Sequence, residues 1–213
     1  MGLEQFTALP EEKRRKIIDA AMVEFIEHGY DAASTNRIID RAGISKGVLF
    51  KYFGSKEGLY LFLAEKMADE KVRWMAAEGV QLPDGLFAIL KFFTVHELSF
   101  LENNRQHYYL YRRIRENPTH PINAKILTML ADKSSLMLRK ITELLPTEEL
   151  REGVTLVDLL RLIGWISEGY AQENQIDIEV LGWKDKLIRD WDQIFFCLQY
   201  GLSKREDDSN AQG

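Results

Sequence analysis

Residues 34–56 read STNRIIDRAGISKGVLFKYFGSK, and this stretch holds the most informative local pattern of the chain. It predicts two short helices that are joined by a tight turn. Ser34 can cap the first helix, because its hydroxyl can accept a hydrogen bond from an unpaired N–H group of the first turn. Gly43 can end that helix in a left-handed conformation, and Ser45 offers a cap for the second helix. Two helices joined by a short turn that contains glycine are typical of the helix-turn-helix unit.

The same stretch is basic, although the chain as a whole is acidic. Its charged residues are five cations and one anion, namely Arg37, Arg41, Lys46, Lys51, Lys56 and Asp40. The net charge of the full chain is −5. A local basic surface on an acidic protein favours phosphate binding at one place. The alternative interpretation is a plain solvated helical hairpin, because short motifs also match by accident.

A longer run of residues resembles a known family. The run comprises Ile17-Ile18-Asp19-Ala20-Ala21, Phe25, Gly29-Tyr30, Ala42-Gly43-Ile44-Ser45-Lys46-Gly47, Leu49-Phe50, Tyr52-Phe53 and Ser55-Lys56. It resembles the N-terminal domain of TetR-type transcriptional regulators and follows that pattern without a gap. The resemblance covers the first third of the chain, and the rest fits the family in length and helical pattern only. A DNA-binding regulator is what the resemblance implies.

In this family the second helix of the motif reads base edges, so the resemblance also implies a set of DNA-contacting positions. The set is Thr35, Asn36, Lys46, Gly47, Val48, Phe50, Lys51, Tyr52 and Lys56. Lys46 can donate to guanine and Val48 can contact a thymine methyl group. The Tyr52 hydroxyl can donate to a phosphate. Phe50 and Val48 stand where tyrosine and threonine are frequent in the family, so each lacks a hydroxyl for a polar contact.

The rest of the chain shows helical spacing and no sustained strand alternation. We predict a loosely ordered arm over residues 1–9, a first helix from Pro10 to Gly29 and a long helix over 56–79. Further helices are predicted at about 84–102, 104–116, 121–145, 152–172 and 184–203. The fold class is therefore all-α. The resemblance implies an N-terminal three-helix helix-turn-helix domain and a larger C-terminal helical domain for ligand binding and dimerisation. The domains are expected at 10–70, with the motif at about 34–53, and at 71–204, followed by a disordered tail at 205–213.

Composition argues against several other classes of protein. No stretch approaches eighteen uninterrupted apolar residues, and the first ten residues do not read as a signal peptide. The single Cys197 cannot form an internal disulfide, so we expect a cytoplasmic protein with a reduced thiol. No Ser/His/Asp set or Gly-rich phosphate loop supports an enzyme. His96 and His107 have no carboxylate partner at firm spacing, so neither a metal site nor a cofactor is expected.

The resemblance further implies an effector between the middle helices and a homodimer formed by the last two helices. The candidate effector residues are Phe92, Phe93, Phe100, Tyr108, Tyr111 and Trp165. The candidate dimer residues are Leu156, Leu160, Ile163, Gly164, Trp191, Phe195 and Leu198. For the aromatic residues plain core packing is the alternative, and the apolar stripes of the last two helices can equally pack within one chain.

Two functional hypotheses follow. The favoured one is a sequence-specific repressor whose operator binding is released by a small-molecule effector. The alternative is an architectural or occlusion protein that binds DNA without an effector. The expected partners are a palindromic operator on double-stranded DNA, a second copy of the chain and a small molecule that the sequence does not identify. The second copy and the palindrome are expected because a single helix-turn-helix reads too few base pairs by itself.

Overall fold

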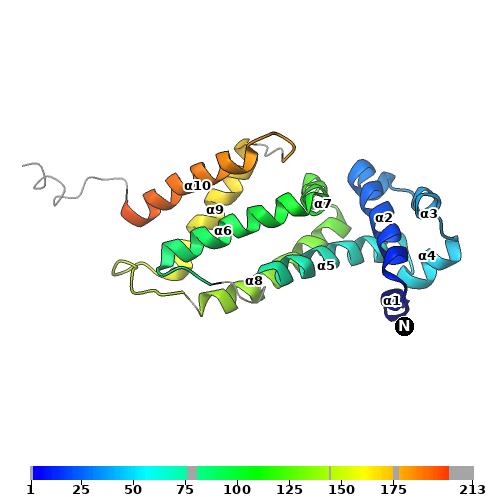
Figure 1. Cartoon of the computed structure of the whole chain (residues 1–213), viewed down its shortest axis with the longest axis horizontal. Helices are drawn as coiled ribbons and strands as arrows, with labels where there is room; N and C mark the ends of the chain where they lie inside the picture. The colour runs from blue at the N-terminus through cyan, green and yellow to red at the C-terminus, as the bar shows by residue number, and fades with distance from the viewer. Residues whose placement is uncertain (1, 76–80, 144, 175–177, 202–213) are drawn as a thin grey trace, which may run out of the picture. The chain divides into compact units, whose positions relative to one another are not determined.

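The computed structural model describes residues 2–75, 81–143, 145–174 and 178–201, and within these ranges every regular element is an α-helix (Figure 1). The helices are α1 (Gly2–Thr7), α2 (Glu11–Ala32), α3 (Thr35–Ala42), α4 (Lys46–Phe53), α5 (Lys56–Met75), α6 (Leu86–Asn103), α7 (Arg105–Glu116), α8 (Pro121–Thr142), α9 (Leu156–Asn174) and α10 (Trp183–Tyr200). The predicted all-α fold class is confirmed. The predicted tail at 205–213 and the predicted end of the long helix at 76–79 lie outside the described residues.

The chain divides into two compact units. The first unit comprises residues 1–78 and 100–141, and the second comprises residues 79–99 and 142–213. The first unit therefore contains the helix-turn-helix together with α5, α7 and most of α8. The functional division that we expected near residue 70 stays a prediction, since compactness alone does not assign a function to either part.

The predicted loose arm over residues 1–9 is wrong, because most of it is the helix α1. Phe6 on this helix is only 1% exposed and belongs to the core of the first unit. Its ring lies 4.9 Å from the ring of Phe53 and 5.3 Å from that of Phe62, measured between ring centroids. A short polar segment thus becomes ordered because one buried aromatic side chain anchors it.

The core of the first unit joins the helix-turn-helix to its supporting helices. Ile17 of α2, Ile38 of α3 and Leu49 of α4 are all buried in it. Leu59 of α5 and Ile114 of α7 are buried in the same cluster. Burial of one such aliphatic side chain stabilises a fold by roughly 1.5–3 kcal/mol. The contacts within this core are therefore enough to order the short helices α1, α3 and α4, which would be marginal alone.

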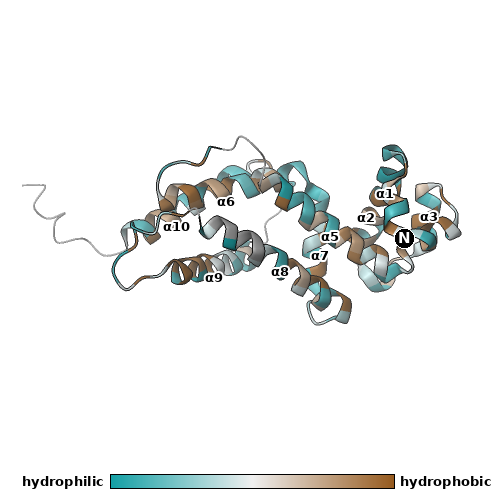
Figure 2. Cartoon of the chain, turned by 90° about the horizontal axis from the view of Figure 1, so that it is seen from below, coloured by the Kyte–Doolittle hydropathy of each residue, from teal (hydrophilic) through white to brown (hydrophobic). Residues whose placement is uncertain are grey.

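In the second unit α9 begins later than predicted, at Leu156 rather than near residue 152. Thr155 explains this start, because its Oγ1 accepts a hydrogen bond from the Asp158 N–H at 3.2 Å. The Asp158 carboxylate in turn accepts from the Thr155 N–H at 3.1 Å. This reciprocal pair is a capping box, which fixes the first turn of the helix. Figure 2 shows apolar colouring along part of α9.

Candidate nucleic-acid interface

The helix-turn-helix is built from the local signals that its sequence predicts. Ser34 precedes α3, and its Oγ accepts a hydrogen bond from the Arg37 N–H at 3.5 Å. Gly43 follows α3 with φ of 64°, a left-handed conformation that glycine adopts at no steric cost. The Ile44 N–H then donates to the Ile39 carbonyl at 3.2 Å, which closes the turn. Both predicted ends of α3 are confirmed.

The second helix of the unit, α4, differs from the prediction at its start. Ser45 occupies the position before the helix, but its side chain makes no capping hydrogen bond. Ser55 does cap the following helix, since its Oγ accepts from the Gly58 N–H at 3.0 Å. Leu49 and Phe53 are the buried residues of α4. The opposite side of α4 is therefore presented to solvent.

The solvent side of α4 carries most of the residues predicted to contact DNA. Lys46, Gly47 and Lys51 are exposed, while Val48, Phe50 and Tyr52 are half-buried. At the start of α3, Asn36 is exposed and Thr35 is half-buried. Eight of the nine predicted positions thus lie on the first turn of α3 or on α4. Whether they contact DNA stays a prediction.

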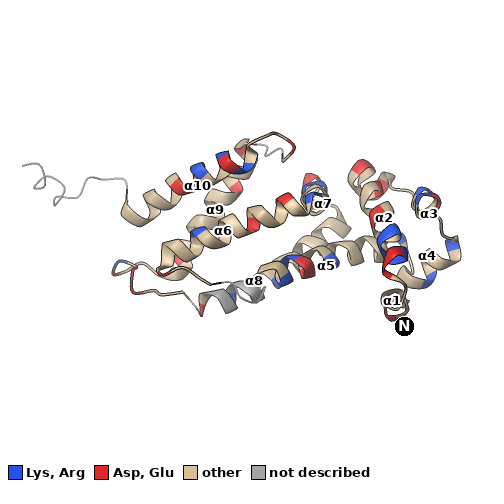
Figure 3. Ribbon diagram, in the orientation of Figure 1, with Lys and Arg blue, Asp and Glu red and all other residues tan. Residues whose placement is uncertain are grey.

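Two lysines of this surface carry charge that the rest of the described chain does not neutralise. The Lys46 ammonium lies 5.9 Å from the centre of the Phe50 ring, and the Lys51 ammonium lies 5.7 Å from that of Tyr52. Within the described residues no carboxylate lies within ion-pair distance of either lysine. Figure 3 shows the blue positions on α3 and α4, and charges of both signs on α2.

Arg37 is engaged by the protein itself. Its Nε donates to the two carboxylate oxygens of Glu24 at 2.9 and 3.1 Å, and its Nη2 donates to Glu24 at 2.5 Å and to the Ala32 carbonyl at 2.8 Å. Glu24 is buried on α2 and also accepts from the Ser34 N–H at 2.7 Å. Burial raises the pKa of the Glu24 carboxyl, but the hydrogen bonds from Arg37 and Ser34 outweigh it and hold the pKa below 4.5. Arg37 therefore orients α3 on α2 and contributes less to the basic surface than its formal charge indicates.

Lys56 has a structural role that the sequence reasoning missed. Its ammonium donates to the carbonyls of Tyr30, Asp31 and Ala33 at 2.8, 3.1 and 3.2 Å. It also lies 4.7 Å from the centre of the Tyr30 ring. These carbonyls belong to the last residues of α2 and the residue after it, where acceptors are otherwise unpaired. We therefore leave Lys56 out of the DNA-binding surface proposed below.

A second cation closes the same end of α2 from another helix. Arg113 of α7 donates through Nε to the Ile26 carbonyl at 3.1 Å and through Nη2 to the Glu27 carbonyl at 2.8 Å. Gly29, which follows shortly after, has φ of 67° and interrupts the helical geometry of α2. The two freed carbonyls thus receive donors from α7, which ties α7 to the helix-turn-helix.

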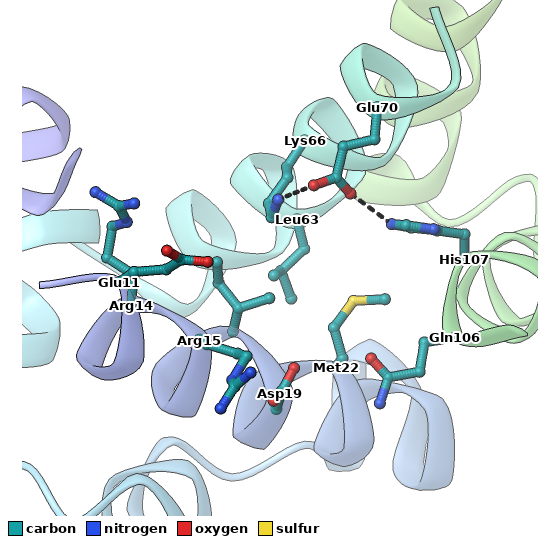
Figure 4. Close-up of a pocket in the computed structure, with 11 residues that line it drawn as sticks. Glu11, Arg14, Arg15, Asp19, Met22, Leu63, Lys66, Glu70, Gln106 and His107 are labelled. Carbon is teal, nitrogen blue, oxygen red and sulfur yellow. Dashed lines mark hydrogen bonds and ion pairs between the residues drawn. The ribbon is translucent and has the colours of Figure 1, made fainter. Parts of the chain in front are cut away.

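The first unit also contains a pocket of about 350 Å³ between α2, α5 and α7 (Figure 4). Met22 and Leu63 form part of its wall, and a chain of polar groups forms another part. Lys66 donates to Glu70, and His107 Nε2 lies 2.9 Å from the second carboxylate oxygen of Glu70. Burial raises the pKa of Glu70, but these two hydrogen bonds dominate and lower it to about 2. The carboxylate is therefore already partnered in the structure.

The six predicted effector residues do not form one site in either unit. Phe92, Phe93 and Trp165 belong to the second unit, and Phe100, Tyr108 and Tyr111 belong to the first. None of them lines the pocket of Figure 4. Phe100 is buried against Trp74 and stacks on His107, whereas Tyr111 and Trp165 are exposed. Core packing, the alternative considered from the sequence, accounts for Phe100, and an effector role for the others stays a prediction.

The predicted dimer residues divide into two groups. Trp191 and Phe195 are buried inside the second unit, with ring centroids 5.5 Å apart. The others are half-buried or, for Gly164, exposed; they are Leu156, Leu160, Ile163, Gly164 and Leu198. The large apolar side chains that α9 and α10 expose are different residues, namely Val157, Leu162, Trp165, Phe196 and Tyr200. Trp191 and Phe195 thus lie on the side of α10 that packs inward, and a dimer role for the predicted residues stays a prediction.

The described residues also show two absences that bear on other kinds of site. No group of three or more His, Cys, Asp or Glu side chains in the described ranges is placed to hold a metal ion. Among the described helices, none is long and apolar enough to cross a membrane.

Comparison with known proteins identifies a family and relatives that resemble the N-terminal part of the chain. Residues 17–62 match the model of the bacterial regulatory proteins of the tetR family, and α1 precedes this matched segment. The chain is 43% identical over 65 residues to the HTH-type transcriptional activator FasR of Mycolicibacterium smegmatis, covering 30% of each chain. It is 35% identical over 71 residues to the HTH-type transcriptional repressor AcnR of Corynebacterium glutamicum, covering 33% of this chain and 38% of the repressor. The chain thus matches about a third of the length of these curated relatives.

Solved structures share the fold over most of the chain. The transcriptional regulator FadR of Bacillus subtilis, in complex with stearoyl-CoA, matches with a TM-score of 0.66 at 20% identity, over 89% of this chain and 99% of that protein. A putative transcriptional regulator of Pseudomonas aeruginosa matches with a TM-score of 0.64 at 17% identity, over 92% and 97% of the two chains. At these identities the likeness shows a common fold. Over residues 17–62, the helix-turn-helix segment of the chain thus matches the tetR family of bacterial regulatory proteins.

Proposed function

We propose that this protein is a sequence-specific DNA-binding transcriptional regulator, and that it acts as a repressor whose operator binding is released by a small-molecule effector. The observation that carries the proposal is the solvent side of α4. Lys46, Gly47 and Lys51 are exposed there, on a short helix whose other side is anchored by Leu49. A rigid helix that presents cations without carboxylate partners suits the major groove of DNA.

The proposed contacts divide into base reading and phosphate binding. Lys46, in the first turn of α4, donates to guanine, and Gly47 lets the backbone approach the bases closely. Lys51 and Tyr52, one turn later, bind phosphates together with Thr35 and Asn36 at the start of α3. Val48 and Phe50 add apolar contact, because neither carries a hydroxyl. Arg37 and Lys56 act inside the domain, where they fix the orientation of α3 and the end of α2.

A homodimer is part of the proposal. Two copies would place two α4 helices on the two halves of a palindromic operator, which supplies the specificity that one copy lacks. The exposed apolar side chains of α9 and α10 support a surface for the second copy, since large exposed apolar areas mark interaction sites. Trp165 is the most informative member, because it is the most exposed of them at 66%.

The effector is proposed to act by population shift. A ligand that binds better to a dimer with the wrong separation of its α4 helices lowers operator affinity in proportion to that preference. FadR of Bacillus subtilis, which has the same fold, was solved with stearoyl-CoA. This supports a ligand role for the helices that follow the helix-turn-helix. Because FasR is an activator and AcnR is a repressor, experiment must determine whether this protein represses or activates.

Selection of bound DNA from a random pool of duplexes tests the proposal. The full chain should enrich one sequence with two-fold symmetry, and retention of the pool without enrichment would refute sequence-specific binding. A thermal-shift screen then identifies ligands, each of which is added to the complex with the selected DNA. Release of DNA by a stabilising ligand supports the repressor. An architectural protein would keep its DNA with every ligand that it binds.

A further inference from the structure

The helix α1 lies directly against the part of α4 that we propose binds phosphate. Besides its contacts with Phe53 and Phe62, the Phe6 ring lies 5.6 Å from the ring of Tyr52. Tyr52 is half-buried, so one side of its ring is covered by α1 while the residue still reaches solvent. The helix α1 thus contacts the core and also Tyr52, whose hydroxyl we propose binds a DNA phosphate.

Backbone packing at the start of α1 is equally close. A Cβ atom placed on Gly2 would lie 2.7 Å from the Tyr52 carbonyl oxygen and 2.8 Å from the Lys51 carbonyl oxygen. Any side chain at this position would collide with backbone, which cannot move aside without displacing the last turn of α4. Gly2 therefore permits α1 to rest on the end of α4.

The other end of α1 is held by α2. Arg14 Nη1 donates to the Leu9 carbonyl at 3.1 Å and also to the Thr7 carbonyl. These acceptors are the last residue of α1 and a residue that follows it, where helical partners end. The short helix is consequently fixed at three points, by Gly2 on α4, by Phe6 in the core and by Arg14 at its end.

We propose that α1 is a positioning element for DNA binding, which holds the last turn of α4 so that Lys51 and Tyr52 meet the phosphates of the operator. The inference rests on the proposed function and adds an element to it. A short helix such as α4 has few hydrogen bonds of its own, and small rotations of its last turn would carry both side chains away from the DNA. Contacts that fix this turn before binding reduce the ordering that binding requires.

The test compares Phe6→Ala with Leu3→Ala, a control on the same helix. Leu3 is 44% exposed and Phe6 is 1% exposed, so truncation of Leu3 removes an apolar side chain of the same helix that lies outside the buried core. Affinity for the selected operator is measured by fluorescence anisotropy at a temperature where circular dichroism shows each variant folded. Phe6→Ala should weaken operator binding about tenfold, the effect of losing a hydrogen bond to a charged group, and Leu3→Ala should leave it unchanged.

A double-mutant cycle with Tyr52→Phe separates positioning from general stability. Tyr52→Phe removes only the hydroxyl, and it should weaken binding in the wild-type background but not in the Phe6→Ala background, where the hydroxyl is already misplaced. Independent effects of the two substitutions would overturn the inference, as would a folded Phe6→Ala protein with wild-type affinity.

If Phe6→Ala does not fold, Gly2→Ala decides, because it pushes α1 off the end of α4 and removes no core side chain. A Gly2→Ala protein with lowered operator affinity supports the inference, and one with wild-type affinity overturns it. A wild-type chain that selects no DNA sequence would instead contradict the proposed function.

Discussion

Lys51 and Lys56 carry the same charge five residues apart, yet their contacts in the structure differ. Both belong to the set of residues predicted to contact DNA. The Lys51 ammonium is exposed over Tyr52, whereas the Lys56 ammonium has three carbonyl partners at the end of α2. We expect Lys51→Ala to change DNA binding and Lys56→Ala to change stability.

The magnitudes follow from these contacts. Each phosphate contact by a cation contributes about 0.9 to the slope of log K against log salt concentration. The proposed dimer places two copies of Lys51 on the operator, so Lys51→Ala should reduce the steepness of the slope by about 1.8. Its free energy of unfolding should stay within about 0.5 kcal/mol of the wild type, because an exposed side chain is removed. Lys56→Ala should lower the free energy of unfolding by about 2 kcal/mol. The substitution removes three hydrogen bonds from a half-buried ammonium and its contact with the Tyr30 ring.

Two assays separate the roles. Anisotropy titrations of the selected operator at several salt concentrations give the slope, and urea denaturation gives the free energy of unfolding. Lys125→Ala is the control, since Lys125 is an exposed lysine of the same unit that pairs with Glu57 at 3.1 Å. The reasoning is refuted by a Lys56→Ala protein of wild-type stability with a reduced salt slope, or by a Lys51→Ala protein with an unchanged slope.

Three further variants test other parts of the structure. Because the folded pKa of Glu70 is about 2 against an ordinary 4.5, its stabilisation is complete above pH 4.5 and is lost as the pH falls towards 2. After allowance for solvent screening, Glu70→Gln should cost about 1–2 kcal/mol at neutral pH and almost nothing near pH 2 in urea denaturation, and a cost independent of pH would contradict the assigned pKa. Arg113→Met should lower the free energy of unfolding by about 1–2 kcal/mol, since two carbonyls of α2 lose their donors, and a neutral substitution would show that water replaces the guanidinium. Trp165→Glu should convert the proposed dimer to a monomer of unchanged helicity in sedimentation experiments, whereas an unchanged mass would remove α9 from the interface.

The helix-turn-helix was predictable because its signals are local. Ser34 and Gly43 act on groups within five residues of themselves, and the structure places both at the ends of α3 as expected. Leu49 and Phe53 follow helical spacing, and they are the buried residues of α4. A short-range pattern of caps and apolar positions therefore predicts where these helices begin and end, although Ser45 makes no capping hydrogen bond and the core supplies the stability.

The roles of the charged residues depended on contacts that the sequence does not display. Arg37 meets Glu24 across thirteen residues, and Lys56 meets the Tyr30 carbonyl across twenty-six. Counting charges in one stretch treats such residues as free, although tertiary packing has already assigned them partners. The same limit applies to α1, whose single buried residue Phe6 gives no periodic pattern in so short a segment.

Apolar stripes in α9 and α10 showed that these helices pack, but not which side packs inward. In α10, Phe195 is buried and the adjacent Phe196 is exposed. A helix with apolar residues on two sides fits equally well in either rotation, and only its neighbours decide between them. Surfaces for a second copy or an effector therefore require tertiary structure before residues can be chosen.

The most direct test of the central claim is to run the random-pool selection in parallel with the wild type and Lys46→Ala. Lys46 is proposed to read a base from the first turn of α4, so its removal should relax the preference at one position in each half-site and keep the two-fold symmetry and spacing. The account predicts this change at a single base pair per half-site. Identical sequence preferences for the two proteins, or no enrichment by the wild type, would contradict it.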